Sequence, residues 1–140
     1  MPDYVPHLRL THEGALKMLH AGIAKALEMR QPQCITIVDD GGHLLAFVRM
    51  DGAKVLSIDS SRKKAMTAAS SRVPSGQVHA AVEIKLALAT AGKVTNLLGG
   101  VPVVVDGHVI GAVGVGSGTG EQDFEVAQAA IAALPGARQY

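Results

Sequence analysis

The sequence is poor in aromatic residues and has one cysteine. It contains no tryptophan, two tyrosines and two phenylalanines, together 3% of the chain. So few rings are too few for a stacking platform of the kind that binds single-stranded nucleic acid. Cys34 has no partner for a disulfide within the chain, and its apolar neighbours predict a buried residue in a reducing compartment.

The chain also has no basic stripe and no long apolar run, and its first residues lack the basic and apolar regions expected of a signal peptide. Its 13 Lys and Arg residues against 12 Asp and Glu residues give a net charge of +1, and the densest basic cluster is Arg62-Lys63-Lys64. That cluster is too small for nucleic-acid binding. No apolar stretch approaches the roughly 20 residues of a membrane helix. We therefore expect a cytoplasmic protein with neither a nucleic-acid nor a membrane partner.

The chain is rich in aliphatic hydrophobic residues. Of 140 residues, 48% are hydrophobic and only 18% are charged. This length and composition predict one globular domain over residues 1–140, with a core that needs no disulfides. Small domains rich in alanine and valine often associate, so we also expect a homo-oligomer.

Four segments have the pattern of helices. The first runs from His12 to Arg30 behind the N-cap Thr11. The last begins with a capping box formed by Thr119 and Gln122. The apolar face predicted for the first helix consists of Leu16, Leu19, Ile23 and Leu27, and the other three helices are predicted over 55–70, 77–91 and 120–134.

Two β-hairpins complete the pattern. Strands are predicted over 34–38 and 43–50, joined by an Asp-Asp-Gly-Gly turn, and over 101–105 and 108–115, joined by Asp106-Gly107. Hairpins in place of βαβ crossovers indicate an antiparallel sheet with helices packed on its faces. The fold class is therefore α/β of the α+β type.

Glycines alternate from Gly114 to Gly120, between the last strand and the last helix. The spacing fits neither a dinucleotide-binding loop nor a P-loop. The run is either a tight structural turn or, through Gly116 and Gly118, a wall of a small-molecule pocket that a flat ligand can approach closely.

Among the six histidines, which show no metal-site spacing, His20 is the candidate haem ligand. It lies on the apolar stripe of the first helix, and haem iron needs one nitrogen ligand in apolar surroundings. The alternative is a core or interface histidine.

Four charged residues have two readings each. Arg49 is either a residue at the edge of a strand or a hook for an anion, and Lys64 is either a surface charge or a hook for a ligand carboxylate. Glu121 and Asp123 stabilise a helix N-terminus or, in the alternative, act as a general acid and base.

Three stretches together resemble the GlcG/HbpS family, which includes the C-terminal domain of PduO. Residues 37–52 resemble the family hairpin "VVDxxGxLxAFxRMDGA", and residues 57–65 resemble its "SIxxAxxKAxTA" helix. Residues 99–123 match "GGxPxxxDGxxIGAIGVSGxxxEQD", except that Gly116–Gly120 stands where many relatives have Ser-Gly-Gly. The resemblance covers about residues 10–133.

The resemblance implies a profilin-like fold, with an antiparallel sheet of about five strands and helices on both faces. It also implies an oligomer that binds haem or acts near corrinoid or small-acid metabolism. It supports Arg49 and Lys64 as ligand-contacting positions. Cobalamin adenosylation, which PduO owes to a separate N-terminal domain, is not expected of these 140 residues.

Two functions follow. The first is a binding protein for haem or a related tetrapyrrole, in an accessory or sensing role. The second is a small catabolic enzyme for a hydroxy- or keto-acid. It would use Arg49 or Lys64 as the hook and Glu121 or Asp123 for proton transfer.

Overall fold

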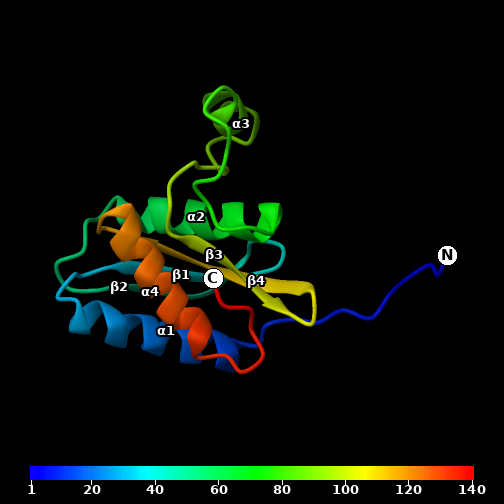
Figure 1. Ribbon diagram of the computed structural model, residues 1–140, viewed down its shortest axis with the longest axis horizontal. Helices are drawn as coiled ribbons and strands as arrows, with labels where there is room; N and C mark the ends of the chain where they lie inside the picture. Colours follow the sequence, from blue (N-terminus) through cyan, green and yellow to red (C-terminus); the bar gives the residue numbers. More distant parts are fainter.

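The computed structural model describes residues 1–140 and contains four helices and four strands (Figure 1). In chain order they are α1 (His12–Glu28), β1 (Cys34–Asp39), β2 (Leu44–Arg49), α2 (Ser57–Ser71), α3 (Glu83–Ala89), β3 (Gly100–Val105), β4 (His108–Gly116) and α4 (Gly120–Ala132). The strands form one sheet in the order β2-β1-β4-β3, and all neighbours are antiparallel. The class is as predicted, but a sheet of about five strands is wrong: there are four.

Both predicted hairpins are confirmed, and local chemistry explains their turns. In the β1–β2 turn the Asp39 carboxylate accepts hydrogen bonds from the backbone N–H groups of Gly41 and His43, each at 2.9 Å. In the β3–β4 turn both central residues have positive φ, 50° at Asp106 and 78° at Gly107. Such dihedrals match the twist of the flanking strands, which is why Asp-Gly is favoured there.

Helices cover both faces of the sheet. α1 and α4 pack against each other and against one face, where alternate strand residues such as Ile35, Val113 and Val115 form the larger core. α2 lies alone on the opposite face, over Val38 and Ala112 (Figure 1). The two layers therefore differ in thickness and in side-chain size.

α2 lies close to the sheet because β3 and β4 present glycines to it. Gly100 and Gly114 are register partners, and a Cβ atom on Gly114 would lie 2.0 Å from the Ser61 carbonyl oxygen. Gly114 and Gly116 thus belong to β4, and the expectation that the whole run from Gly114 to Gly120 is a turn is wrong. Their hydrogen side chains are needed for helix-on-sheet contact.

The buried face of α1 is not the predicted one. The residues inside are Ala15, Met18, Leu19, Gly22 and Ala26. Leu16 and Leu27 are exposed and Ile23 is half-buried, so of the expected face only Leu19 is in the core. The helix contacts α4 and β1 at short range, and small residues permit that approach: a Cβ on Gly22 would already lie 3.0 Å from Ile35.

Residues 73–98, which we call the arm, leave α2 and return to β3. A helix was predicted over 77–91, but α3 spans only seven residues, has no side-chain cap and buries none of its residues. Figure 1 shows α3 standing away from the body, above α2. None of the four helices has the length and apolar character needed to cross a bilayer.

Candidate functional site

An ion pair buried beneath the surface joins α2 to the first turn of α4. Lys64 Nζ lies 2.8 Å from Asp123 Oδ2 and donates a second hydrogen bond, also of 2.8 Å, to the carbonyl oxygen of Val115. The two side chains are 5% and 3% exposed. Of the two interpretations of Lys64 from the sequence, a surface charge or a hook for a ligand carboxylate, this burial contradicts the first.

The chain around the pair satisfies its remaining polar atoms. Asp123 Oδ1 accepts a hydrogen bond from the Gly118 N–H at 3.0 Å, and Gln33 Oε1 accepts from the same N–H at 3.1 Å. Space is tight, because a Cβ on Gly99 would lie 2.9 Å from the Asp123 Cβ. Since each charge already neutralises the other, Lys64 is not a free carboxylate hook and Asp123 is not a free proton carrier.

A small polar cavity of about 260 Å³ adjoins this pair. Its walls carry the hydroxyl groups of Ser57, Ser60 and Ser117, and Gly118 also lines it. Ser117 has φ of 112° and is held by hydrogen bonds from the Lys54 N–H and to Ser57 Oγ. Gly116 is buried against Ser57 and Ser60, so of the two predicted pocket glycines only Gly118 borders open space.

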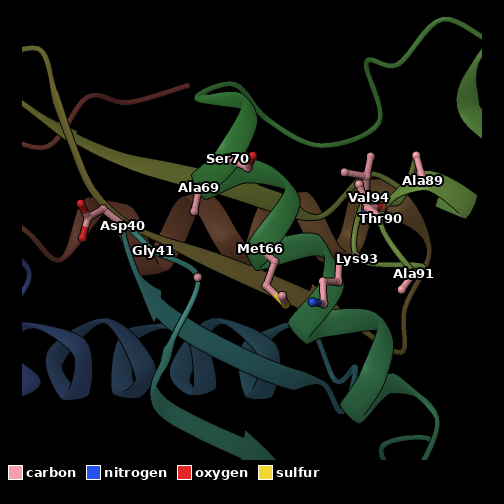
Figure 2. A pocket seen from close by; sticks show the side chains of 11 residues that line it. Asp40, Gly41, Met66, Ala69, Ser70, Ala89, Thr90, Ala91, Lys93 and Val94 are labelled. Atoms are coloured by element: carbon pink, nitrogen blue, oxygen red, sulfur yellow. Dashed lines mark hydrogen bonds between the residues drawn. The ribbon is translucent and has the colours of Figure 1, made fainter. Parts of the chain in front are cut away.

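A larger cavity of about 580 Å³ lies between α2 and the arm. Figure 2 shows Met66, Ala69 and Ser70 of α2 on one side, with Thr90 and Val94 of the arm on the other. The β1–β2 turn closes one end through Asp40, Gly41 and Gly42, and Lys93 adds a cation. Its volume lies within the range typical of small-molecule sites.

The sequence patterns did not single out this cavity. Met66 falls within the helix predicted over 55–70, and Lys93 lies between the helix predicted over 77–91 and the strand predicted over 101–105, so neither residue was assigned a role. The arm that carries Thr90 and Val94 has a helical pattern over 77–91, but it has no motif that predicts where it folds. The local feature that bears on this cavity is the glycine pair of the turn, Gly41-Gly42, which puts no side chain beside α2. Gly42 has φ of 82°, and a Cβ added to it would lie 3.5 Å from the Met66 side chain.

The other predicted site residues are dispersed. His20 is exposed on α1, on the side of the sheet opposite α2, and Arg49 is exposed at the end of the edge strand β2. Glu121 is exposed in the first turn of α4, where its negative charge interacts favourably with the helix dipole. No group of three His, Cys, Asp or Glu side chains is placed to hold a metal ion.

Cys34 is fully buried in β1, as expected of a core thiol. Burial raises the pKa of this thiol, and the nearby charge of Arg49 opposes the rise without cancelling it. A thiol with a raised pKa is a poor nucleophile, so Cys34 is a packing residue.

These features define a small α+β protein with helices on both faces of an antiparallel sheet and a ligand-sized cavity over one helix. The family model described as "Haem degrading protein HbpS-like" matches residues 10–132. The chain belongs to this family, which confirms the resemblance found in its motifs.

Proteins of known sequence resemble this chain over most of its length. The chain is 41% identical over 127 residues to an uncharacterised 15.0 kDa protein from the dhaT-dhaS intergenic region of Citrobacter freundii, covering 87% of this chain and 89% of that protein. It is 44% identical over 107 residues to protein GlcG of Escherichia coli K12, covering 76% and 80%. The corrinoid adenosyltransferase PduO of Citrobacter freundii is 31% identical, but the match covers 92% of this chain and only 40% of PduO.

Solved structures show the same fold. Protein ORFY of Klebsiella pneumoniae superimposes with a TM-score of 0.88 at 34% identity, covering 95% of this chain and 96% of that one. The PduOC:heme complex gives 0.86 at 28% identity, with coverage of 95% and 99%. An HbpS double mutant of Streptomyces reticuli gives 0.84 at 29% identity, with coverage of 96% and 92%.

Proposed function

We propose that this protein binds haem or a related tetrapyrrole, in an accessory or sensing role. The observation that carries the proposal is the 580 Å³ cavity between α2 and the arm. The likeness to the PduOC:heme complex over 95% of the chain supports the ligand class.

The cavity fits a flat, largely apolar ligand with acidic edges. Gly41 and Gly42 put no side chain into it, so a ring can lie against the turn. Met66, Ala69 and Val94 supply apolar contacts. Lys93 supplies an ammonium group suited to a propionate, because an exposed cation pairs readily with a carboxylate.

Two side chains compete for the iron. Met66 offers a thioether inside the cavity, and thioether and imidazole are both established axial ligands of haem iron. His20 lies on the other side of the sheet among Leu16, Ile23 and Leu27, a stripe that is exposed or half-buried. Haem held by His20 would lie on α1 and make no use of the cavity. We assign the site to the cavity because it is concave and ligand-sized.

The catabolic-enzyme alternative has less support. In that alternative Lys64 would bind the substrate carboxylate and Asp123 would transfer the proton. Both side chains are instead paired with each other in a buried ion pair. Its other residues, Arg49 and Glu121, are exposed and line neither the 580 Å³ cavity nor the polar cavity beside the pair.

The test is a haem titration of the purified protein, followed by the Soret band. Wild type is compared with Met66→Leu and His20→Ala, and Met50→Leu serves as a control because Met50 is a methionine outside the cavity. We expect saturable binding with one haem per chain. Met66→Leu should shift the Soret band and weaken binding, Lys93→Gln should weaken binding without changing the band, and Met50→Leu and His20→Ala should match wild type.

The titration distinguishes the position of the haem site from haem binding itself. Loss of binding in His20→Ala alone would keep haem and move its site to α1. A linear, non-saturable response of the wild type would overturn the function itself.

A further inference from the structure

The small polar cavity beside the Lys64–Asp123 pair is separate from the cavity between α2 and the arm. The two cavities have no lining residue in common. The polar cavity has a volume of about 260 Å³, below the roughly 300–1,000 Å³ of sites for drug-sized ligands. A ligand that fits it therefore has only a few non-hydrogen atoms and is not haem.

A chain of hydrogen bonds ends in this cavity at Ser57. The backbone N–H of Lys54, which can only donate, bonds Ser117 Oγ at 2.8 Å, and Ser117 Oγ in turn donates to Ser57 Oγ at 2.9 Å. Ser57 is only 7% exposed, and its own hydroxyl hydrogen has no acceptor within the chain. A buried donor without an acceptor is unfavourable, and a ligand oxygen in the cavity removes that penalty.

Two further donors line the cavity. Ser60, one turn beyond Ser57 on α2, is half-buried, and its hydroxyl makes no hydrogen bond within the chain. The Lys64 ammonium has three hydrogens, of which two are donated, to Asp123 and to a strand carbonyl oxygen. Both carboxylate oxygens of Asp123 already accept hydrogen bonds. The side chains of the cavity therefore favour a ligand that accepts hydrogen bonds.

We propose that this cavity binds a small carboxylate. Its lining residues carry two positive charges, on Lys54 and Lys64, and one negative charge, on Asp123. The last two form an ion pair, whereas the exposed Lys54 ammonium has no partner, so a single negative charge balances the site. The hydrophobic residues of the wall are Leu97 and Leu98, which suit a short carbon chain behind the carboxylate.

The backbone of Ser117 fits this role. Its φ of 112° lies in the region that favours glycine, and both of its neighbours are glycines. A third glycine would adopt this backbone with less strain, but it would lack the hydroxyl that links Lys54 to Ser57. Residues held in strained conformations cluster at ligand sites, where the side chain is needed in that place.

The test is a titration of the full chain, without haem, with sodium butyrate at pH 7, followed by the amide signals in ¹H–¹⁵N NMR spectra. We expect saturable shifts centred on residues 54–60 and 117–120, with a dissociation constant on the order of 1 mM, as suits so small a ligand. Inorganic phosphate, which carries more charge, should bind more weakly than butyrate.

Variants that remove one donor test the contacts. Ser60→Ala deletes a hydroxyl that makes no bond within the chain, so the fold should be kept while binding weakens roughly ten-fold. Ser57→Ala should have a similar effect. The matched control is Ser71→Ala, on the same helix but outside the cavity, which should bind as wild type does.

A second pair of variants tests the charge. Lys54→Gln should weaken binding roughly three-fold and reduce its dependence on salt, because the lost charge is exposed and therefore screened. Lys93→Gln is the control, since Lys93 is an equally exposed lysine that lines the larger cavity. It should leave butyrate binding unchanged.

Three results would overturn the inference. They are the absence of saturable shifts in wild type up to about 20 mM butyrate, unchanged binding in both Ser57→Ala and Ser60→Ala, and loss of binding in Lys93→Gln with Lys54→Gln unaffected. Tighter binding of phosphate than of butyrate would overturn the assignment to a carboxylate. Because haem is absent and the two cavities share no residue, failure of haem binding cannot produce any of these results.

Discussion

α2 and the arm both lie above the same face of the sheet, and they are held there by different forces. Half of α2, including Lys64, Ala65 and Ala68, is buried, and its backbone touches β4 across glycines. Most large apolar side chains of the arm are exposed. The arm is fixed by a few hydrogen bonds, in which Thr67, Ser75 and Asn96 donate to the carbonyl oxygens of Lys93, Leu97 and Val78. Small residues thus make the rigid part of this layer, while the large apolar residues of the arm remain available for binding.

The largest loss of stability is expected when one charge of the buried Lys64–Asp123 pair beneath α2 is removed. Lys64→Met leaves the Asp123 carboxylate buried without its partner, which should lower the free energy of unfolding by about 3–5 kcal/mol. Urea denaturation measures the loss. The control is Lys63→Met, a change one residue away at a half-buried side chain, which should cost little. If Lys64→Met/Asp123→Leu did not recover most of the stability, the loss would come from packing and not from the stranded charge.

Inserting a methyl group between α2 and β4 should lower the free energy of unfolding by nearly as much. In Gly114→Ala the new methyl group meets the Ser61 carbonyl oxygen and the Ala65 nitrogen, at 2.0 and 2.5 Å, so α2 must shift. We expect a loss of about 3 kcal/mol by thermal or urea unfolding. Gly107→Ala is the control, because no atom lies within 4 Å there and only the positive φ opposes the change, at about 1–2 kcal/mol. Equal losses in the two variants would contradict the role assigned to Gly114.

The β1–β2 turn differs from the arm in that its hydrogen bonds converge on one carboxylate, that of Asp39. Burial alone would raise the pKa of Asp39, but the hydrogen bonds from Gly41 and His43 and the nearby His43 ring outweigh it and lower the pKa below its usual value of 3.8. Asp39→Ala should therefore cost about 1–2 kcal/mol at pH 7. A lowered pKa gives stability that is present above pH 3.8 and is lost as pH falls through the folded value. Unfolding curves of both proteins should thus converge in acid, and a difference that persisted once the folded carboxyl group is protonated, well below pH 3.8, would show that the carboxylate charge is not the cause.

The smallest change in stability is expected for a substitution in the arm. Leu88→Ala removes a side chain that is 78% exposed, so in dilute monomer the free energy of unfolding should change by less than about 0.5 kcal/mol. Chemical denaturation at a concentration below association measures it. A loss above about 1.5 kcal/mol would mean that the arm belongs to the cooperative core.

Local signals made much of the fold predictable. The two hairpin turns and the capping box of Thr119 and Gln122 depend on residues a few positions apart, and all three are present. The buried face of α1 was mispredicted because hydrophobicity favoured Leu16 and Leu27, while the close α1–α4 contact selects small residues. The length of α3 was overestimated because periodicity does not register the absence of a packing partner.

The candidate site was less predictable than the fold. Lys64 and Asp123 were each identified from sequence, but as separate groups, since nothing local links residues 59 positions apart. Met66 and Lys93 were not identified as neighbours, because the arm that brings them to one cavity has no motif.

The sequence by itself determined the order of elements, the turns, the caps and the family, because each depends on short-range backbone preferences or on motifs read in order. Only the tertiary structure decided which helix face is buried, that Lys64 and Asp123 form a pair, and where the cavities lie. Those outcomes depend on contacts between distant segments, where the space available between α2 and the sheet is set by the absent side chains of Gly100 and Gly114.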